Sequence, residues 1–483
     1  MLKKVLNKYN SFPRQAKAAF WFLICSFLQK GISMLTTPIF TRLLSEAEFG
    51  QFGVFNSWLG IITVFVSLNL GAGVFTQGLV KFDQERKIFT SSLQGLTLLS
   101  TSVWTVVYLL FRDKWNELFS LTTTQMLAML IMIWATAVFN FWAAEQRVLL
   151  NYKALVAVTL IASIAKPTVG IILVKLSDDK VTARIIGLLL VELVVYAWMF
   201  VVHVARGKKL YSGKFWKYAL LFNLPLIPHY LSQTVLNSSD KIMIEKLVGL
   251  EESGIYGLAY SVSQIMTLFN TALVQTINPW LYQKIKERDL GKLPGIAYIS
   301  LTLIASVNLF LIALAPEAVQ IFGGSAYYDA IWVIPPVAMS VFFMFCYSLF
   351  AAFEFYYKKT FGVAVATIAG AALNVLLNYI FIPIFGYYAA GYTTLFCYIV
   401  YAAAHYVFMS RICKQEGFAK VYDLRFLLGI SVIFIAAGFA LMLTYRILWL
   451  RLLVVFISVV ICILIRKRIV KIFKTFTQMK SKK

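Results

Sequence analysis

The sequence predicts an all-α integral membrane protein with about 14 transmembrane helices. Hydrophobic residues make up 60% of the 483 residues, and charged residues make up only 14%. Apolar runs of about 20 residues recur along the chain, and each is long enough to cross the ~30 Å hydrocarbon core of a bilayer. Backbone N–H and C=O groups in lipid must be satisfied within the segment itself, so such runs form helices.

The expected spans form two pseudo-symmetric lobes of six helices and a pair of additional helices. In chain order they cover residues 16–40, 50–73, 91–111, 124–145, 154–174, 185–205, 217–239, 254–279, 295–315, 329–353, 360–383, 389–409, 425–445 and 448–466. Residues 1–210 form the N-lobe, residues 211–412 form the C-lobe, and residues 413–483 hold the last two helices and a basic tail. The loops are short, so we expect no soluble domain.

A short stretch that occurs twice supports the division into lobes. Thr41–Ser57 (TRLLSEAEFGQFGVFNS) and Glu245–Ser261 (EKLVGLEESGIYGLAYS) align at an offset of 204 residues. A fixed offset of this size indicates two homologous halves rather than a stack of small repeats. In a membrane chain, paired halves with disturbed helices around a polar centre are typical of a transporter.

The net charge of +24 indicates orientation rather than nucleic-acid binding. Most of the 45 Lys and Arg residues fall in the predicted loops on the side of the amino terminus. By the positive-inside rule this places both termini in the cytoplasm. The basic tail Arg466–Lys483 is also suited to contact with anionic lipids.

Two lysines, Lys30 and Lys166, lie inside apolar segments. A cation within a span is energetically expensive and normally faces a bundle interior or a wet cavity. The alternative for Lys30 is that it snorkels to the interface or pairs with a carboxylate that holds helices together. Pro167 directly follows Lys166 and should kink its helix.

Polar side chains repeat at helical spacing along several of the expected spans. They are candidates for lining a substrate cavity, although small polar residues also hold membrane helices together. Asn374 and Asn378 share one helix face and are able either to bind sugar hydroxyls or to bridge helices. The remaining candidates are Ser33, Thr37, Asn56, Gln233, Asn237, Gln264, Thr267 and Thr271.

No constellation of residues indicates catalysis, a metal or an organic cofactor. His203, His229 and His405 are far apart in the sequence and lack metal-ligand spacing. There is no GxxxxGK[ST] phosphate loop, and the five cysteines form no CxxC pair. Coupling to H⁺ or Na⁺ is left open, with His229, Asp240 and Glu192 as candidates.

Three segments resemble polysaccharide transporters of the multidrug/oligosaccharidyl-lipid/polysaccharide (MOP) exporter superfamily, and most closely the Wzx-type flippases. The segments are Pro38–Phe55, Ser238–Val262 and Asn374–Thr394. The resemblance implies two six-helix lobes around a V-shaped central cavity in the bacterial cytoplasmic membrane. It also implies that undecaprenyl-diphosphate-linked oligosaccharides of O-antigen, capsule or exopolysaccharide move from the inner to the outer leaflet by alternating access.

The resemblance also suggests roles for individual residues and partners. Relatives often line the cavity with basic side chains, which correspond here to Lys30 and Lys166. The repeated turns then become gate or rim elements, and polysaccharide polymerase and assembly proteins become candidate partners beside the membrane lipids. The gate or rim residues are Arg42, Gly50, Gly53, Lys246, Gly254 and Gly257.

Two other functions remain as alternatives. A cation-coupled drug or small-molecule antiporter of the same superfamily would need a buried carboxylate site. A membrane glycan polymerase or ligase would need catalytic groups on sizeable loops, but the longest loops on the far side have only about a dozen residues, so we do not expect an enzyme. A lipid II flippase is a close variant of the main interpretation.

Overall fold

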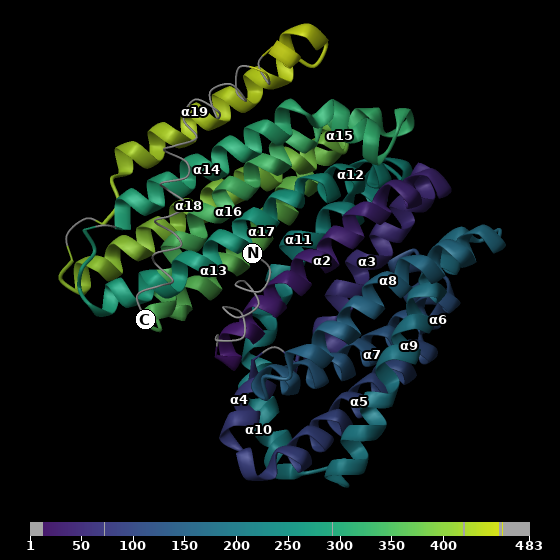
Figure 1. Cartoon of the computed structure of the whole chain (residues 1–483). Helices are drawn as coiled ribbons and strands as arrows, with labels where there is room; N and C mark the ends of the chain where they lie inside the picture. Colours follow the sequence, from purple (N-terminus) through teal and green to yellow (C-terminus); the bar gives the residue numbers. More distant parts are fainter. Residues whose placement is uncertain (1–12, 72, 292, 419–420, 454–455, 457–483) are drawn as a thin grey trace, which may run out of the picture. The chain divides into compact units, whose positions relative to one another are not determined.

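The computed structural model describes residues 13–71, 73–291, 293–418, 421–453 and 456. Within these ranges the chain forms helices and no strand (Figure 1). By its internal contacts the chain separates into two compact units, Met1–Ile242 and Met243–Lys483. The lobe boundaries expected from the sequence, at residues 210/211 and 412/413, stay a prediction.

The first unit is built around α9, which packs against α5, α7 and α8. Helix α2 in turn packs along α8, and α3 contacts α7 and α9. The elements of this unit are α2 (Arg14–Leu43), α3 (Glu46–Val66), α4 (Val74–Lys81), η1 (Asp83–Glu85), α5 (Arg86–Leu110), α6 (Arg112–Phe119), α7 (Thr123–Val148), α8 (Tyr152–Leu176), α9 (Lys180–Gly207), α10 (Gly213–Asn223) and η2 (Leu224–Leu226). Helix α11 (Ile227–Leu247) runs across the boundary between the units.

The second unit is built around α16, whose apolar stretch is 83% buried. Helix α16 contacts α13, α14 and α18, while α17 packs on α18 and α19 packs on α14 (Figure 1). The elements are α12 (Leu250–Ser263), α13 (Ile265–Lys286), α14 (Leu293–Ala313), α15 (Ala315–Phe322), η3 (Ser325–Trp332), α16 (Ile334–Tyr356), α17 (Thr360–Phe385), α18 (Tyr388–Gln415) and α19 (Leu424–Leu443).

In the part of the chain that the structure describes, 11 helices are long and apolar enough to span a membrane. They match the expected spans one to six and nine to thirteen, so the expected count of fourteen is not confirmed. Expected span 217–239 is divided among α10, η2 and α11, and expected span 254–279 is divided between α12 and α13. Their polar residues lower the mean hydropathy. The last expected span, 448–466, lies mostly outside the described residues.

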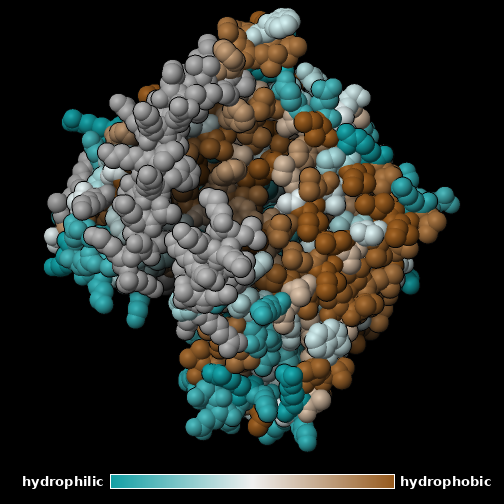
Figure 2. Space-filling view, viewed as in Figure 1, coloured by the Kyte–Doolittle hydropathy of each residue, from teal (hydrophilic) through white to brown (hydrophobic). Residues whose placement is uncertain are grey.

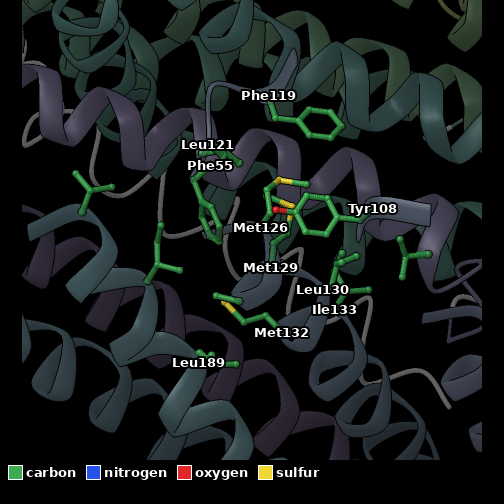
Figure 3. Close-up of a cluster of buried hydrophobic side chains, with 14 residues drawn as sticks. Phe55, Tyr108, Phe119, Leu121, Met126, Met129, Leu130, Met132, Ile133 and Leu189 are labelled. Carbon is green, nitrogen blue, oxygen red and sulfur yellow. The ribbon is translucent and has the colours of Figure 1, made fainter. Parts of the chain in front are cut away.

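A cluster of buried hydrophobic side chains fixes α7 within the first unit (Figure 3). The cluster includes Phe55 of α3, Tyr108 of α5, Phe119 of α6, Met129 of α7 and Leu189 of α9. Between membrane helices the gain comes from close van der Waals packing, because lipid tails are as apolar as these side chains. The cluster therefore sets the position of α7 against α9.

The surface of the helices is apolar over wide areas, as Figure 2 shows on its visible face. Large hydrophobic side chains on spans in both units are strongly exposed, among them Leu176 and Val194 at 77% and Leu443 at 81%. A water-soluble protein rarely exposes contiguous apolar patches of this extent. The exposed faces are those expected of helices that contact lipid.

In the first copy of the repeated turn, side-chain contacts fix the residues before and after Leu44. Ser45 caps α3 by accepting a hydrogen bond from the Glu48 backbone N–H at 3.2 Å, and the Glu48 carboxylate accepts one from the Ser45 N–H at 2.7 Å. The Arg184 guanidinium of α9 lies 3.7 Å from the ring centroid of Phe40 and 3.6 Å from that of Phe52. This cation–π stack joins α2, α3 and α9.

The second copy has a simpler cap. At the 204-residue offset, Gly249 takes the place of Ser45 and Glu252 takes that of Glu48. Gly249 is the N-cap of α12 and makes no side-chain hydrogen bond. Glycine is an accepted N-cap residue, so α12 begins here without the serine hydroxyl.

Candidate functional site

Lys166 and Glu192 form an ion pair between α8 and α9. The Lys166 Nζ donates to Glu192 Oε1 at 2.6 Å, and the Thr136 hydroxyl of α7 donates to Glu192 Oε2 at 3.2 Å. The Tyr196 ring lies with its centroid 5.5 Å from the ammonium. The Glu192 side chain is 5% exposed and that of Lys166 is 27% exposed. The structure therefore joins two residues that the sequence assigned to different roles, substrate binding and ion coupling.

Lys30 has a different environment. It lies inside the membrane-spanning part of α2, Phe20–Leu43, and its side chain is exposed. Among the described residues no carboxylate lies at ion-pair distance from it. Helix α2 packs on α8, so Lys30 and Lys166 lie on neighbouring helices. Lys30 therefore has no carboxylate partner for the alternative role of an ion pair among the described residues, whereas Lys166 has one.

The other predicted cavity residues of the first unit hydrogen-bond mainly to their own helices. The Thr37 hydroxyl donates to the Ser33 carbonyl at 3.0 Å. The Asn56 amide donates to the Phe52 carbonyl at 2.8 Å. On α11, the Asn237 amide donates to the carbonyl of Gln233, also at 2.8 Å. Four of the predicted residues are exposed, namely Ser33, Asn56, Gln233 and Asn237.

In the second unit, the predicted polar stripe begins at the break between α12 and α13. Gln264 ends α12, and the Thr267 hydroxyl donates to its carbonyl at 2.6 Å. The Thr271 hydroxyl then donates to the Thr267 carbonyl at 2.7 Å. These bonds satisfy backbone carbonyls at and after the break between α12 and α13.

Asn374 and Asn378 lie inside the second unit and are fully buried. The Asn374 amide donates to the Thr394 hydroxyl at 3.2 Å, and the Asn378 amide donates to Asn374 Oδ1 at 3.4 Å. The Thr393 hydroxyl donates to Asn378 Oδ1. The sequence left two roles open for these amides, sugar binding and the bridging of helices, and the contacts in the structure bridge α17 to α18. Sugar binding by the same amides stays a prediction.

The predicted gate residues lie at the ends of helices next to the turns. Arg42 donates from Nη1 to the Pro38 carbonyl at 2.7 Å, so its charge stays at the end of α2. The backbone of Gly53 lies against α11, where an added Cβ would be 3.5 Å from the Lys241 side chain. Gly50, Gly254 and Gly257 are buried, and Lys246 is exposed. Motion at these residues remains a prediction.

The other two ion-coupling candidates lie on α11. Asp240 is 2% exposed, whereas His229 is half-buried near the beginning of the helix and its ring lies 5.9 Å from that of Tyr230. Among the described residues no group of three or more His, Cys, Asp and Glu side chains is arranged to hold a metal ion.

Two buried Glu–His contacts were missed by the sequence analysis. His203 of α9 lies 3.2 Å from the carboxylate of Glu145, and His405 of α18 lies 2.5 Å from that of Glu354. The sequence analysis examined the histidines only for metal-ligand spacing. Their separation of 202 residues, close to the 204-residue offset of the repeated turn, was the signal that could have paired them.

A pocket of about 510 Å³ opens where α2, α7 and α8 end or begin. Lys17 and Lys153 line it together with the amides of Gln146 and Asn151. The pocket is roughly 20 Å along α8 from Lys166, at 1.5 Å of rise per residue. Two ammonium groups and two amide donors suit an anionic group.

The chain is similar to known families and proteins over most of its length. Residues 16–284 match the family described as polysaccharide biosynthesis protein. Protein 1 of the Lsg locus of Haemophilus influenzae is 28% identical over 195 residues, which cover 38% of this chain and 47% of that relative. The match therefore spans less than half of that relative's length. An uncharacterised membrane protein of the same organism is 20% identical over 352 residues, 70% of this chain and 83% of its own.

Solved transporters share the fold. The lipid II flippase MurJ in an inward closed conformation aligns with a TM-score of 0.69 and 16% identity, covering 92% of this chain and 99% of its own. An inward-facing multidrug resistance MATE family transporter of the MOP superfamily aligns with a TM-score of 0.63 and 16% identity, covering 81% and 96%. The expected helical fold is confirmed, and it resembles the fold of these transporters of the MOP superfamily.

Proposed function

Since this chain belongs to the polysaccharide biosynthesis protein family, we propose that it is a flippase for lipid-linked oligosaccharides. Its substrate would be an undecaprenyl-diphosphate-linked repeat unit of O-antigen, capsule or exopolysaccharide. The protein would carry the head group from the inner to the outer leaflet of the bacterial cytoplasmic membrane by alternating access, with both termini in the cytoplasm. Polysaccharide polymerase and assembly proteins would be its partners.

The observation that carries this proposal is Lys30, an exposed cation within a membrane span that lacks a carboxylate partner among the described residues. An ammonium in a span is costly unless it faces water or an anion. The diphosphate of a polyprenyl-linked sugar is such an anion, and charge-assisted hydrogen bonds to phosphate oxygens are strong. The role of Lys30 is therefore to bind the diphosphate.

The positive charge of Lys166 is already balanced by the Glu192 carboxylate. Its side chain is 27% exposed, so the ammonium reaches the surface of the unit while Thr136 holds the carboxylate in place. Lys166 contributes to diphosphate binding by exchanging part of its bond to Glu192 for a phosphate oxygen. The pocket with Lys17 and Lys153 is suited to receive the anionic head first.

The membrane potential favours the proposed direction of transport. Moving negative charge outward, away from the negative inner side, releases about 2.3 kcal/mol per charge per 100 mV. A dianionic head group would gain roughly 4–5 kcal/mol at that potential. Movement of the head group therefore needs no ATP, in agreement with a sequence that lacks a phosphate loop.

The proposal is tested by deleting the gene and measuring lipid-linked sugars by mass spectrometry. We expect a complete lipid-linked repeat unit to accumulate and the surface polymer to disappear. Lipid II as the accumulating species would identify the peptidoglycan variant instead. Unchanged lipid-linked sugars would contradict the proposal. Dye efflux by the protein would then favour the antiporter, and glycan extension by the purified protein would favour the polymerase.

A further inference from the structure

Each unit of the molecule contains one buried pair of a glutamate and a histidine. In the second unit, Glu354 Oε1 of α16 lies 2.5 Å from His405 Nδ1 of α18, and both residues are fully buried. In the first unit, Glu145 Oε2 of α7 lies 3.2 Å from His203 Nε2 of α9, and His203 is 2% exposed. The two pairs use the same residue types on helices that lie fourth and sixth in each predicted lobe.

The positions of the pairs correspond between the two halves of the chain. Glu354 follows Glu145 by 209 residues, and His405 follows His203 by 202 residues. Both offsets are close to the 204 residues that separate the repeated turns. Helix α16 therefore corresponds to α7, and α18 corresponds to α9.

A second polar contact supports this correspondence independently. Lys166 pairs with Glu192 in the first unit, and Asn374 donates to the Thr394 hydroxyl in the second. Thr394 follows Glu192 by 202 residues, the same offset as between the histidines, and Asn374 follows Lys166 by 208 residues. The contact that is a charged Lys166–Glu192 pair in the first unit is therefore an uncharged Asn374–Thr394 contact in the second unit. The Glu–His pair, in contrast, occurs in both units.

The Glu354–His405 pair lies in an aromatic environment without a cation. The ring of His405 lies 4.5 Å from that of Tyr401 and 5.4 Å from that of Tyr347. These two phenols are the titratable groups that face the pair from α16 and α18, and α17 approaches Glu354 with Gly362. Among the described residues, no lysine or arginine lies at ion-pair distance from Glu354 on any helix packed against it.

The second polar atoms of this pair are unpartnered. His405 Nε2 and Glu354 Oε2 are buried, and neither has a hydrogen-bond partner within the described residues. With a neutral imidazole, the pair would keep a net negative charge in a low-dielectric interior, which is energetically costly. One added proton makes an imidazolium–carboxylate pair with no net charge.

The Glu145–His203 pair has partners that suit either protonation state. The Gln94 side-chain amide of α5 lies 2.9 Å from His203 Nδ1. As a donor the amide bonds a neutral imidazole, and after a flip its oxygen accepts from a protonated one. The guanidinium groups of Arg86 and Arg206 act on Glu145 from α5 and α9, but neither lies at ion-pair distance.

We propose that the two Glu–His pairs are proton-binding sites, one in each half of the molecule. Each pair takes one proton from water onto the imidazole nitrogen that does not face the carboxylate, while the carboxylate stays ionised and bonded to the other nitrogen. The proton is held while the pair is buried and is released when a conformational change admits water. This supplies a coupling ion for the proposed transport, but proton binding itself does not depend on which molecule is transported.

The proposal is tested on the full-length protein in lipid nanodiscs by nitrogen NMR of ¹⁵N-labelled histidine. The sequence has three histidines, so each signal is assigned by a single His→Gln substitution. We expect His203 and His405 each to show both a neutral and a doubly protonated form when the pH is varied. Removing the carboxylate with Glu354→Gln should lower the doubly protonated fraction of His405 relative to the neutral form by about tenfold or more at a given pH, because an anion favours the imidazolium.

Each pair is the control for the other. Glu354→Gln should leave the protonation change of His203 as it is in the wild type, which also shows that the variant is folded. Glu145→Gln should likewise leave the protonation change of His405 as it is in the wild type. Glu354→Asp keeps the charge and should keep the titration of His405 if Glu354→Gln does not fold. The proposal is overturned if neither histidine changes its protonation in wild-type protein, or if removal of either carboxylate leaves its partner's titration unchanged. In that case the pairs are only contacts that hold helices together.

Discussion

At the scale of single residues, the two intramembrane lysines differ in how their charge is balanced. Lys166 is bonded to Glu192, whereas Lys30 has no carboxylate partner among the described residues. Removing Lys166 therefore leaves a buried anion, but removing Lys30 does not. A loss of export in a Lys166 variant can arise from lost folding, while a loss in a Lys30 variant reports on binding. Lys30 is the cleaner probe of the proposed function.

The Lys166–Glu192 contact predicts an asymmetric effect of substitution on stability. Lys166→Met should lower the free energy of unfolding by about 3 kcal/mol, at the lower end for a broken buried pair because Lys166 is partly exposed. Lys166→Met combined with Glu192→Gln should recover most of this loss. The measurement is the thermal unfolding midpoint of the detergent-purified protein. A double variant no more stable than Lys166→Met would contradict the role of Glu192 as its counter-ion.

The amide network of α17 and α18 makes a second prediction. Asn374→Ala removes the donor to Thr394 and the acceptor for Asn378, so buried polar groups lose their partners. The expected cost is about 1–3 kcal/mol of stability. Asn56→Ala is the control, since that exposed amide donates to the Phe52 carbonyl of its own helix and its removal should cost little. Equal thermal midpoints for the two variants would show that the network contributes nothing.

At the scale of elements, glycines allow the close approach of α5 to α9 and to the segment after it, next to the Glu145–His203 pair. A Cβ on Gly95 would lie 2.0 Å from the Leu210 carbonyl oxygen, and one on Gly207 would lie 2.3 Å from the Lys87 carbonyl oxygen. Backbone atoms cannot move aside as the end of a flexible side chain can. A methyl group at either glycine must therefore separate the segments.

This contact predicts that Gly95→Ala lowers stability by about 1–3 kcal/mol, the usual cost of overpacking. Gly429→Ala is a matched control, because that glycine of α19 has open space around it and alanine is the better helix former. Purified yield and thermal midpoint should fall for Gly95→Ala and stay level or rise for Gly429→Ala. A Gly95→Ala protein as stable as wild type would rule out the close contact.

Apolar runs were sufficient to predict most elements. Eleven expected spans correspond to long apolar helices, because a run of about 20 apolar residues has few other stable structures in lipid. Spans seven and eight were predicted as continuous, although the chain breaks them at Leu224–Leu226 and at Gln264. The first break lies at Pro225, a residue that the sequence already marks as a helix breaker, whereas the residues around Gln264 are all compatible with a helix.

The contacts of the site were less predictable than its residues. Lys166 was identified from the cost of a buried cation, but its partner Glu192 lies on the next helix, and their meeting depends on the rotation of both helices. To predict the Glu–His pairs, individual residues of the two halves had to be compared with each other. Which side chains meet between two helices depends on how the helices pack, and the periodicity of a single helix carries no information about that packing.

At the scale of the whole molecule, the two halves share an arrangement of polar contacts but differ in charge. The Glu–His pair occurs in both, whereas the lysine and its carboxylate occur in the first unit and are replaced by Asn374 and Thr394 in the second. In the proposed function the first unit therefore supplies the cations for the diphosphate. The second unit has a neutral hydrogen-bonded contact at the matching position.

The central claim is tested most directly by transbilayer movement of an undecaprenyl-diphosphate-linked oligosaccharide in vesicles that contain the purified protein. A membrane-impermeant glycosidase added outside should cleave only the outer-leaflet sugars of protein-free vesicles, and nearly all sugars when the wild-type protein is present. Lys30→Ala should slow this movement by about 10- to 100-fold, the equivalent of one charged hydrogen bond. Lys114→Ala, which removes an exposed lysine of α6, should not slow it. Sugars that stay protected with wild-type protein as in protein-free vesicles would contradict the account.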